Sequence, residues 1–424
     1  MLRERRALSH VGGPARLTGD RAVAEQLAEA IDVPSSEASA ESEALARAHV
    51  HGFHSYPARM HPLAAHRLIE AFSAPGERVL DPFCGSGTVL VEARLAGRAS
   101  VGVDANPLAV RLARLKVRGL GVEERARLLE AAATVAASAD ARRKARVGAT
   151  HRYGPDDVAL FQPHVLLELD GIRAGIDALP EAATRGDLEL VLSAILIKLS
   201  RKSADTSEQG VEKRIAAGYP ARLFVRKTEE LCRNLDSIAA TLAQAPPARV
   251  LEGDARHLEG IAEGSVQLAL TSPPYPGNYD YLAHHAARLR WLRLRPERFD
   301  QAEIGARRHL EPLGEDEGRL RFADELGAVL SAVGRALAPG APFILLIADS
   351  VVSGAPIFAL DLLAELAAPA GFAPVAAASQ LRPHFHAPTG RAFQHRPREE
   401  HAALLARLPS RTAGPRVPAR KLAR

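Results

Sequence analysis

The 424-residue chain has only two cysteines, Cys84 and Cys232, and lacks long apolar runs. Two cysteines cannot build the disulfide framework of a small secreted protein. A membrane-spanning helix needs about 18 or more consecutive apolar residues, so none is expected. The charged start, Met1 to Arg6, is followed by no apolar segment of the secretory-signal kind. These absences predict a protein of the reducing cytoplasm that does not enter membranes.

Acidic residues are absent from the carboxyl-terminal end. The formal net charge of the chain is +5, and residues 409–424 contain five basic residues and no acidic one. This basic tail therefore accounts for the whole excess, and the rest of the chain is balanced. A tail of this kind can add phosphate contacts that are independent of sequence. The simpler interpretation is a solvated, poorly ordered end.

The order of the predicted elements indicates an α/β fold. Strand-like runs at 78–80 and 100–103 are each followed by a turn and a helical pattern. Strand–helix–strand order implies parallel pairing and a doubly wound sheet. Further strand-like runs occur at 249–251, 266–270 and 343–348. The long stretch between the second and third runs is dominated by helical patterns, which predicts a helical insertion into one α/β domain.

Composition and pattern divide the chain into four parts. We expect a poorly ordered leader, one α/β domain in two segments, a helical insertion, and a basic tail. Their predicted bounds are 1–45 for the leader, 46–118 and 248–408 for the domain, 119–247 for the insertion, and 409–424 for the tail.

A glycine-containing loop follows the first predicted strand. It runs from Asp81 through Gly85 and Gly87 to Thr88. The glycines let the backbone approach a ligand closely, and the helix that follows offers free amides to an anion. Asp104 ends the next strand, where it can accept hydrogen bonds from two ribose hydroxyls. A nicotinamide-binding loop would need a third glycine, which is missing here.

A second turn, Thr271-Ser272-Pro273-Pro274-Tyr275, follows the apolar run 266–270. Two consecutive prolines cannot continue a central strand, because neither donates to the ladder. The chain must therefore leave the sheet at Ser272, at the carboxyl end of a strand. Open α/β sheets bind their ligands at this edge. A rigid backbone, one hydroxyl and one aromatic ring suit a flat heterocycle with an exocyclic amine.

The two motifs, in this order, resemble those of the DNA amino-methyltransferases. The segment His54-Ser55-Tyr56-Pro57-Ala58-Arg59 is similar to the amino-terminal cofactor motif of that family. The resemblance implies a Rossmann-like methyltransferase sheet, S-adenosylmethionine as cofactor, no metal, and a base flipped out of duplex DNA. It implies a catalytic turn made of Ser272, Pro273, Pro274 and Tyr275. The cofactor-binding residues that it implies are His54, Tyr56, Asp81, Phe83, Gly85, Ser86, Gly87, Thr88, Asp104, Asn106 and Asp254.

The residue before Pro-Pro-Tyr indicates the target amine. In the resembled family, Ser at this position points to N4 of cytosine, whereas Asp or Asn points to N6 of adenine or to guanine N2 in RNA. Ser272 therefore favours cytosine N4. Methylation of cytosine carbon 5 needs a cysteine nucleophile, and no Pro-Cys pair occurs in the chain.

Several alternatives remain open at this stage. They are an adenine-N6 or RNA amino-methyltransferase, a non-catalytic nucleic-acid-binding protein with the same fold, and, more distantly, a nicotinamide oxidoreductase. A cognate restriction endonuclease is a further expected partner. The sequence determines neither the recognition site nor the oligomeric state.

Basic and aromatic residues near these motifs are candidates for nucleic-acid contact. We expect such contacts from Arg201, Lys202, Tyr279, Arg288 and Arg290. The competing interpretation is that the arginines lie on the solvated face of an amphipathic helix and that the basic residues near 201 end a helix. Four histidines between 51 and 66 match no usual structural-zinc spacing, so no metal site is predicted.

Overall fold

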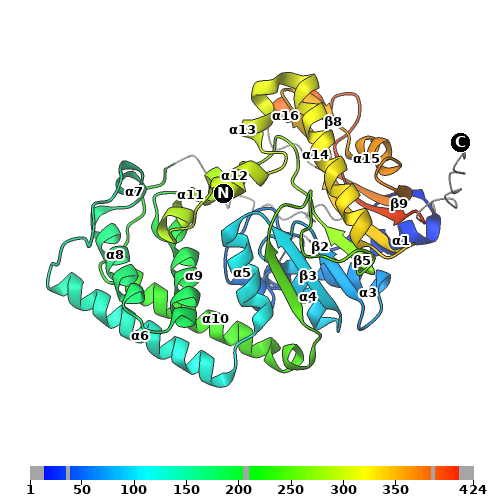
Figure 1. Cartoon of the computed structure of the whole chain (residues 1–424). Coiled ribbons are helices and arrows are strands. Elements are labelled where there is room, and N and C mark those ends of the chain that lie inside the picture. Colours follow the sequence, from blue (N-terminus) through cyan, green and yellow to red (C-terminus); the bar gives the residue numbers. More distant parts are fainter. Residues whose placement is uncertain (1–13, 35–38, 204–209, 383–386, 410–424) are drawn as a thin grey trace, which may run out of the picture.

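The computed structural model describes residues 14–34, 39–203, 210–382 and 387–409. Most of the predicted basic tail, residues 410–424, lies outside these ranges, as do residues 1–13 of the predicted leader. In Figure 1, a sheet flanked by helices occupies one side of the molecule and a group of helices occupies the other. No helix of the described part is both long enough and apolar enough to cross a membrane.

Eight strands of the described chain form one twisted sheet, in the order β1-β9-β10-β6-β5-β2-β3-β4. The strands β4, β3, β2, β5 and β6 are parallel, whereas β10 runs antiparallel between β6 and β9. Their bounds are β1 (Arg16–Gly19), β2 (Arg78–Asp81), β3 (Ala99–Asp104), β4 (Ala248–Glu252), β5 (Leu268–Thr271), β6 (Pro342–Ala348), β9 (Phe372–Leu381) and β10 (Glu399–Arg407). The predicted doubly wound, Rossmann-like α/β sheet is confirmed.

Alternating side chains bury both faces of this sheet. In β2, Val79 packs into one apolar cluster and its neighbour Leu80 packs into another, because successive side chains of a strand point to opposite faces. Helices α1 (Arg21–Ile31), α3 (Pro62–Phe72) and α4 (Thr88–Leu95) cover the first face. The second face is covered by α14 (Gly314–Ala336) and α15 (Ala359–Ala367). Strands buried on both sides explain the apolar runs of the sequence.

The strand order reverses between β2 and β5. From β2 the chain continues outward through β3 to β4, whereas β5 is followed by β6 on the other side. At such a switch point, the connections leave toward opposite faces and open a crevice at the carboxyl ends of the strands. The loop after β2 and the turn after β5 are the two motifs of the sequence, so the topology places both at one crevice.

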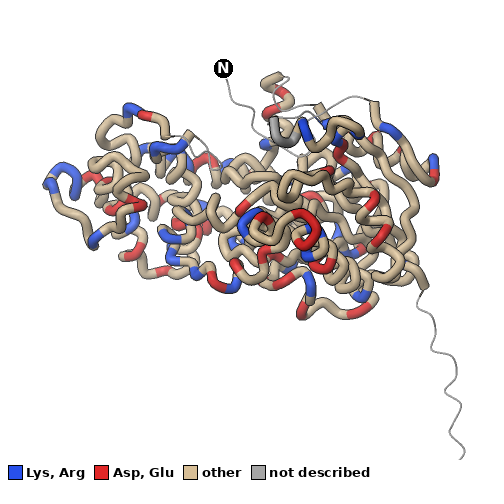
Figure 2. The backbone as a smooth tube through the Cα atoms, turned by 90° about the horizontal axis from the view of Figure 1, so that it is seen from above, with Lys and Arg blue, Asp and Glu red and all other residues tan. Residues whose placement is uncertain are grey.

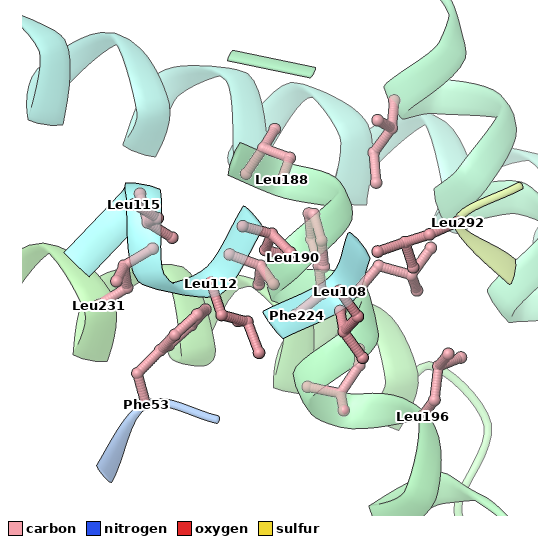
Figure 3. Close-up of a cluster of buried hydrophobic side chains, with 14 of the residues drawn as sticks. Phe53, Leu108, Leu112, Leu115, Leu188, Leu190, Leu196, Phe224, Leu231 and Leu292 are labelled. Carbon is pink, nitrogen blue, oxygen red and sulfur yellow. The ribbon is translucent and has the colours of Figure 1, made fainter. Parts of the chain in front are cut away.

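The insertion is helical in the structure and packs against the sheet domain through α5 (Pro107–Arg118). Leu108, Leu112 and Leu115 of α5 pack among side chains from the insertion, together with the ring of Phe53 (Figure 3). The helices between the two sheet segments are α6 (Val122–Lys144), α7 (Pro155–Leu160), α8 (Pro163–Asp177), α9 (Ala182–Leu199) and α10 (Tyr219–Gln244). A continuous apolar core therefore joins insertion and sheet domain.

The expectation of a poorly ordered leader is wrong for its described residues. Strand β1 pairs antiparallel with β9 from Arg16 to Gly19 and extends the sheet at its edge. Helix α1 buries Ala24, Leu27 and Ile31 against the sheet. The few apolar residues of this region are spread along one face of α1, so they form no continuous apolar run in the sequence, yet together they pack against the sheet.

Short elements complete the described chain. They are α2 (Ala40–Ala46), η1 (His49–Gly52), α11 (Tyr281–Trp291), α12 (Glu297–Ala302), α13 (Arg307–Leu310), η2 (Glu311–Leu313), the hairpin β7 (Ser350–Val352) and β8 (Ala355–Ile357), and α16 (Ala387–Ala392). Helices α11 to α13 follow the proline turn and pass over the crevice side of the sheet (Figure 1).

Candidate active site

One pocket at the carboxyl edge of the sheet is lined by both sequence motifs. Gly85 and Ser86 of the loop after β2 line it, and so do Ser272 and Pro274 of the turn after β5. The sequence motifs are almost 190 residues apart along the chain, and the switch point of the sheet brings them together. Of the other predicted site residues, the pocket wall includes Tyr56, Asp81, Phe83, Thr88, Asp104 and Asn106.

The glycine-containing loop is held close to its surroundings. Gly85 has a φ of +49°, and a Cβ atom added to it would lie 3.3 Å from Cε1 of Tyr56. Gly87 has a φ of +86° and caps α4, where a Cβ atom would lie 3.0 Å from Ala113. Gly87 is not part of the pocket wall. It shapes the loop, whereas Gly85 leaves room beside the aromatic ring.

Two carboxylates at the strand ends face the pocket. Asp81 accepts hydrogen bonds from Oγ1 of Thr271 at 2.6 Å and from the Phe83 amide at 3.1 Å. Asp104 accepts from the amides of Gly85 and Asn106, both at 2.8 Å. Burial raises the pKa of Asp81 to about 7 and that of Asp104 to about 6, although these hydrogen bonds act in the opposite direction. Both groups therefore favour a ligand that brings a cation or hydrogen-bond donors.

The side chain of Tyr275 does not line the pocket, which contradicts the expected contact of this aromatic ring with a flat heterocycle. The residue is 5% exposed, and its hydroxyl donates to Oε1 of Glu400 at 3.1 Å. Pro273 is likewise buried and absent from the pocket wall. The turn therefore presents Ser272 and Pro274 to the pocket and directs Tyr275 into the sheet. The sequence motif could not show this direction, because it depends on the packing of β10.

Two predicted cofactor ligands also have other partners. His54 is buried, and its Nε2 hydrogen-bonds Oγ of Ser193 at 2.9 Å. It therefore joins the segment between η1 and α3 to the insertion and does not line the pocket. The carboxylate of Asp254 forms an ion pair with Arg256 at 2.6 Å. The residues beside it, Gly253 and Ala255, line the pocket in its place. The predicted contacts of His54 and Asp254 with the cofactor do not fit these placements.

Residues that sequence reasoning missed close the pocket on a third side. Tyr281, Phe299, Ala302, Glu303 and Ile304 line it. Oε1 of Glu303 accepts from the amide of Tyr281 at 2.7 Å, and its Oε2 pairs with Arg308 at 2.8 Å. No motif marks this segment, although an aromatic residue directly after the proline turn was a usable signal.

Comparison with known proteins agrees with this geometry. Residues 31–115 match the family model described as DNA methylase. This part of the chain is similar to the DNA methylase family. The chain is 31% identical over 81 residues to the type II methyltransferase M.MjaII of Methanocaldococcus jannaschii, a match that covers 19% of this chain and 15% of that protein. It is 50% identical over 40 residues to the type II methyltransferase M.MthZI of Methanothermobacter thermautotrophicus, covering 9% and 11%.

The matched segments span less than a sixth of the length of these curated relatives. Among solved structures, an SAM-dependent methyltransferase of Methanosarcina mazei is 10% identical, with a TM-score of 0.32 over 80% of this chain and 97% of that chain. The methylase segment holds the loop from Asp81 to Thr88 and Asp104, whereas the proline turn lies outside it.

S-adenosylmethionine is the cofactor of the DNA methylase family, and the pocket of this chain fits it. Oγ of Ser86 is buried on the pocket wall and has no hydrogen-bond partner within the described ranges. A carboxylate group at the start of α4 would supply an acceptor for this hydroxyl and for the free amides. Asp104 would accept from the ribose hydroxyls, and the Tyr56 ring lies beside Gly85. When bound, the cofactor supplies an electrophilic methyl group.

The predicted nucleic-acid contacts separate into buried and accessible residues. Arg288 is completely buried, and its guanidinium donates to Oγ of Ser55 at 2.9 Å, so its predicted role as a phosphate ligand is wrong. Arg290 is exposed but pairs with Asp157 at 3.0 Å. Arg201 is exposed and Lys202 is partly exposed. Tyr279 packs against Tyr281, with 5.5 Å between the ring centroids.

Proposed function

We propose that the chain is a DNA methyltransferase that transfers a methyl group from S-adenosylmethionine to an exocyclic amine, with N4 of cytosine as its target. The observation that carries the proposal is the shared pocket. The cofactor loop around Gly85 and Ser272 of the proline turn line one cavity, so a bound methyl donor and an amine would meet there. The match to the DNA methylase family supports DNA as the substrate.

The chemistry requires acceptors for the hydrogens of the amine. An exocyclic amine is a poor nucleophile because its lone pair is delocalised into the ring. Ser272 lines the pocket, so its Oγ is the proposed acceptor, whereas Pro273 does not line the pocket and its carbonyl is not assigned this role. Fixed acceptors localise the lone pair without reorganising during the reaction. Positioning of amine and methyl group can contribute roughly 7–11 kcal/mol toward lowering the barrier.

A flipped base needs an aromatic surface. Removing a base from the duplex costs a few kcal/mol, and stacking on an aromatic ring returns roughly 1–3 kcal/mol. Since Tyr275 is directed into the sheet, we assign the stacking role to Tyr281, which lines the same pocket as Ser272. This assignment moves the aromatic contact six residues along the chain.

The helical insertion is the proposed DNA-contacting region. Within it, Arg201 is exposed and Lys202 is partly exposed. Over the insertion, Lys and Arg alternate with Asp and Glu rather than gathering on one face (Figure 2). We therefore propose a small number of specific contacts rather than a broad basic surface. A partner restriction endonuclease and a location in the cytoplasm remain predictions from the sequence.

An RNA substrate is the second candidate. The chain is 44% identical over 50 residues to a tRNA (guanine(10)-N2)-dimethyltransferase of Methanothermobacter thermautotrophicus, which covers 12% of this chain and 15% of that protein. Ser272 favours cytosine N4 over this alternative and over adenine N6, because the resembled enzymes for those targets carry Asp or Asn at this position.

Nucleoside analysis tests the proposal. Purified protein is incubated with S-adenosylmethionine and, separately, with amplified unmethylated DNA of varied sequence and with transfer RNA. The nucleosides are then analysed by mass spectrometry. We expect N4-methylcytosine in DNA, and a large loss of it with Ser272→Ala. N6-methyladenine in DNA or N2-methylguanine in RNA would replace the proposed target, and no methylation of any substrate would overturn the proposed activity.

A further inference from the structure

One face of helix α11 packs on the segment 54–59, which precedes α3. The buried residues His285 and Arg288 are three positions apart, so they lie on the same side of this helix. The Arg288 guanidinium donates to Oγ of Ser55 at 2.9 Å. The imidazole of His285 stacks on the ring of the next residue, Tyr56, with 4.9 Å between the ring centroids and 26° between the planes. One helix therefore holds two adjacent side chains of the segment.

The ring of Tyr56 connects His285 to the cofactor pocket. Tyr56 lines the pocket, whereas His285 is not part of its wall. Two further contacts fix the Tyr56 ring beside the cofactor loop. Nδ2 of Asn106 donates to its hydroxyl at 3.4 Å, and a Cβ atom added at Gly85 would lie 3.3 Å from its Cε1. A change at His285 would therefore reach the pocket through the position of this ring.

The imidazole of His285 has no hydrogen-bond partner among the residues that the structure describes. The residue is completely buried, and both of its ring nitrogens are unpaired there. Burial lowers the pKa of His285 well below its usual range, and Arg288 and His284 act in the same direction. The ring is therefore uncharged near neutral pH. The stack with Tyr56 is the specific contact that this ring makes, and it needs a flat ring rather than a charge or a hydrogen bond.

We propose that His285 is a positioning residue that holds the ring of Tyr56 in place for bound S-adenosylmethionine. The inference rests on the proposed function only through its cofactor, because it applies whichever amine is methylated. A ring that is already held in place loses less freedom when a ligand binds, so this preorganisation raises the affinity. Without the imidazole, the Tyr56 ring can move into the vacated space, and the cofactor has to order it on binding.

Leu289 provides a matched control on the same helix. It follows His285 by four residues, is 3% exposed, and belongs to the apolar core that includes side chains of the insertion. It is not part of the pocket wall. Truncation of either residue to alanine leaves a cavity and lowers stability. Only His285→Ala also removes the stack with Tyr56, so a difference in cofactor affinity between the two variants isolates the effect of the stack.

The experiment measures the affinity of the full chain for S-adenosylmethionine by isothermal titration calorimetry, without nucleic acid, and stability by urea unfolding. His285→Ala should weaken binding about tenfold, the size expected when an aromatic pair is lost. His285→Phe keeps a flat ring and should stay within about twofold of the unaltered protein. Leu289→Ala should lower the urea midpoint but also leave the affinity within about twofold, as expected of a residue outside the contact.

His285→Leu fills much of the same space without a flat ring, so it tests the stack if His285→Ala does not fold, with a similar loss of affinity expected. Equal affinities for His285→Ala and Leu289→Ala would overturn the positioning role. Binding by His285→Phe as weak as that by His285→Ala would also overturn it, because the ring would not be the cause. Since calorimetry needs no methylated product, the expected affinities would support the positioning role even if the protein methylates no nucleic acid and the proposed function fails.

Discussion

At the strand ends of the sheet, Asp81 and Asp104 face a pocket, whereas Asp157 and Asp187 of the helical insertion face arginines. Asp157 pairs with Arg290 and Asp187 pairs with Arg118, at 3.0 and 2.8 Å. Burial raises the pKa of Asp104 and also that of Asp187, but a nearby guanidinium offsets part of the effect only in the insertion. The carboxylates of the sheet are left to interact with a ligand, and those of the insertion stabilise helix contacts.

This difference shows that a charged residue close to a functional motif does not necessarily contact a ligand. The end of a parallel strand leaves backbone amides and side chains at an open crevice. In a bundle of helices, the charged residues of one helix lie close enough to neighbouring helices to form ion pairs. Four predictions can strengthen or break this interpretation.

The largest effect is expected from Asp104→Ala. Loss of an acceptor for two ribose hydroxyls should weaken S-adenosylmethionine binding about 100-fold, because hydrogen bonds to charged groups contribute roughly 1.5–3 kcal/mol each. Asp187→Ala should lower the thermal unfolding midpoint but leave this affinity within about twofold. Isothermal titration calorimetry measures both. Equal losses of affinity would show that the two regions are not distinct.

The next effect distinguishes two arginines of one helix. Arg288→Ala should lower the free energy of unfolding by about 2–4 kcal/mol, since it leaves the Ser193 carbonyl and Oγ of Ser55 without their charged donor. Arg290→Ala removes a partly exposed ion pair and should cost about 0–1 kcal/mol. Urea unfolding measures the difference. A stable Arg288→Ala protein with reduced DNA affinity would restore the phosphate contact predicted from the sequence.

A smaller effect comes from adding one methyl group. In Gly102→Ala of β3, the new Cβ atom would lie 2.6 Å from Leu90 and 2.7 Å from Cβ of Cys84 in the cofactor loop. We expect a loss of about 1–3 kcal/mol of stability from overpacking. Gly148→Ala in the insertion meets no atom within 4 Å and should change stability by about 0.5 kcal/mol or less. Similar unfolding midpoints for the two variants would contradict the close packing behind the loop.

The smallest effect is a dependence of cofactor binding on pH. The pKa of Asp81 is raised to about 7, and an ammonium group bound beside it would lower that pKa. Binding near pH 6.5 should therefore release a proton, and affinity should rise up to about tenfold per pH unit below pH 7. Calorimetry in two buffers of different ionisation enthalpy detects the release. Asp81→Asn should abolish it, and a persistent release in that variant would assign the proton to another group.

The same raised pKa values affect the stability of the unliganded protein. Stability should fall as the pH rises, whereas affinity for the cofactor should rise. Asp81 and Asp104 bind protons more tightly in the folded chain than in the unfolded chain, where an aspartate has its ordinary pKa of 3.8. Their contribution to stability is therefore fully present below about pH 4 and is lost as the pH rises through 6 to 7. Asparagine at either position should flatten this dependence.

Local sequence signals were sufficient where backbone geometry decides the structure. Glycines at 85 and 87 permit a left-handed backbone, and prolines at 273 and 274 prevent continuation of the strand, whatever surrounds them, so the positions of both turns were predictable. The apolar runs between them identified the strands. The direction of Tyr275 was not predictable, because the partner of its hydroxyl, Glu400, follows 125 positions later. For the same reason, the sequence did not predict that Arg288 is buried or that β1 pairs with β9.

The sequence by itself determined the class of the sheet, the two turns at its carboxyl edge and the loop of the DNA methylase family, because each depends on residues adjacent in the chain. Only the tertiary structure decided which side chains of those motifs enter the pocket and which support it from behind. That choice depends on strand order, on the switch point between β2 and β5, and on partners in β10 and the insertion. These contacts join residues that are distant in sequence, and no local pattern specifies them.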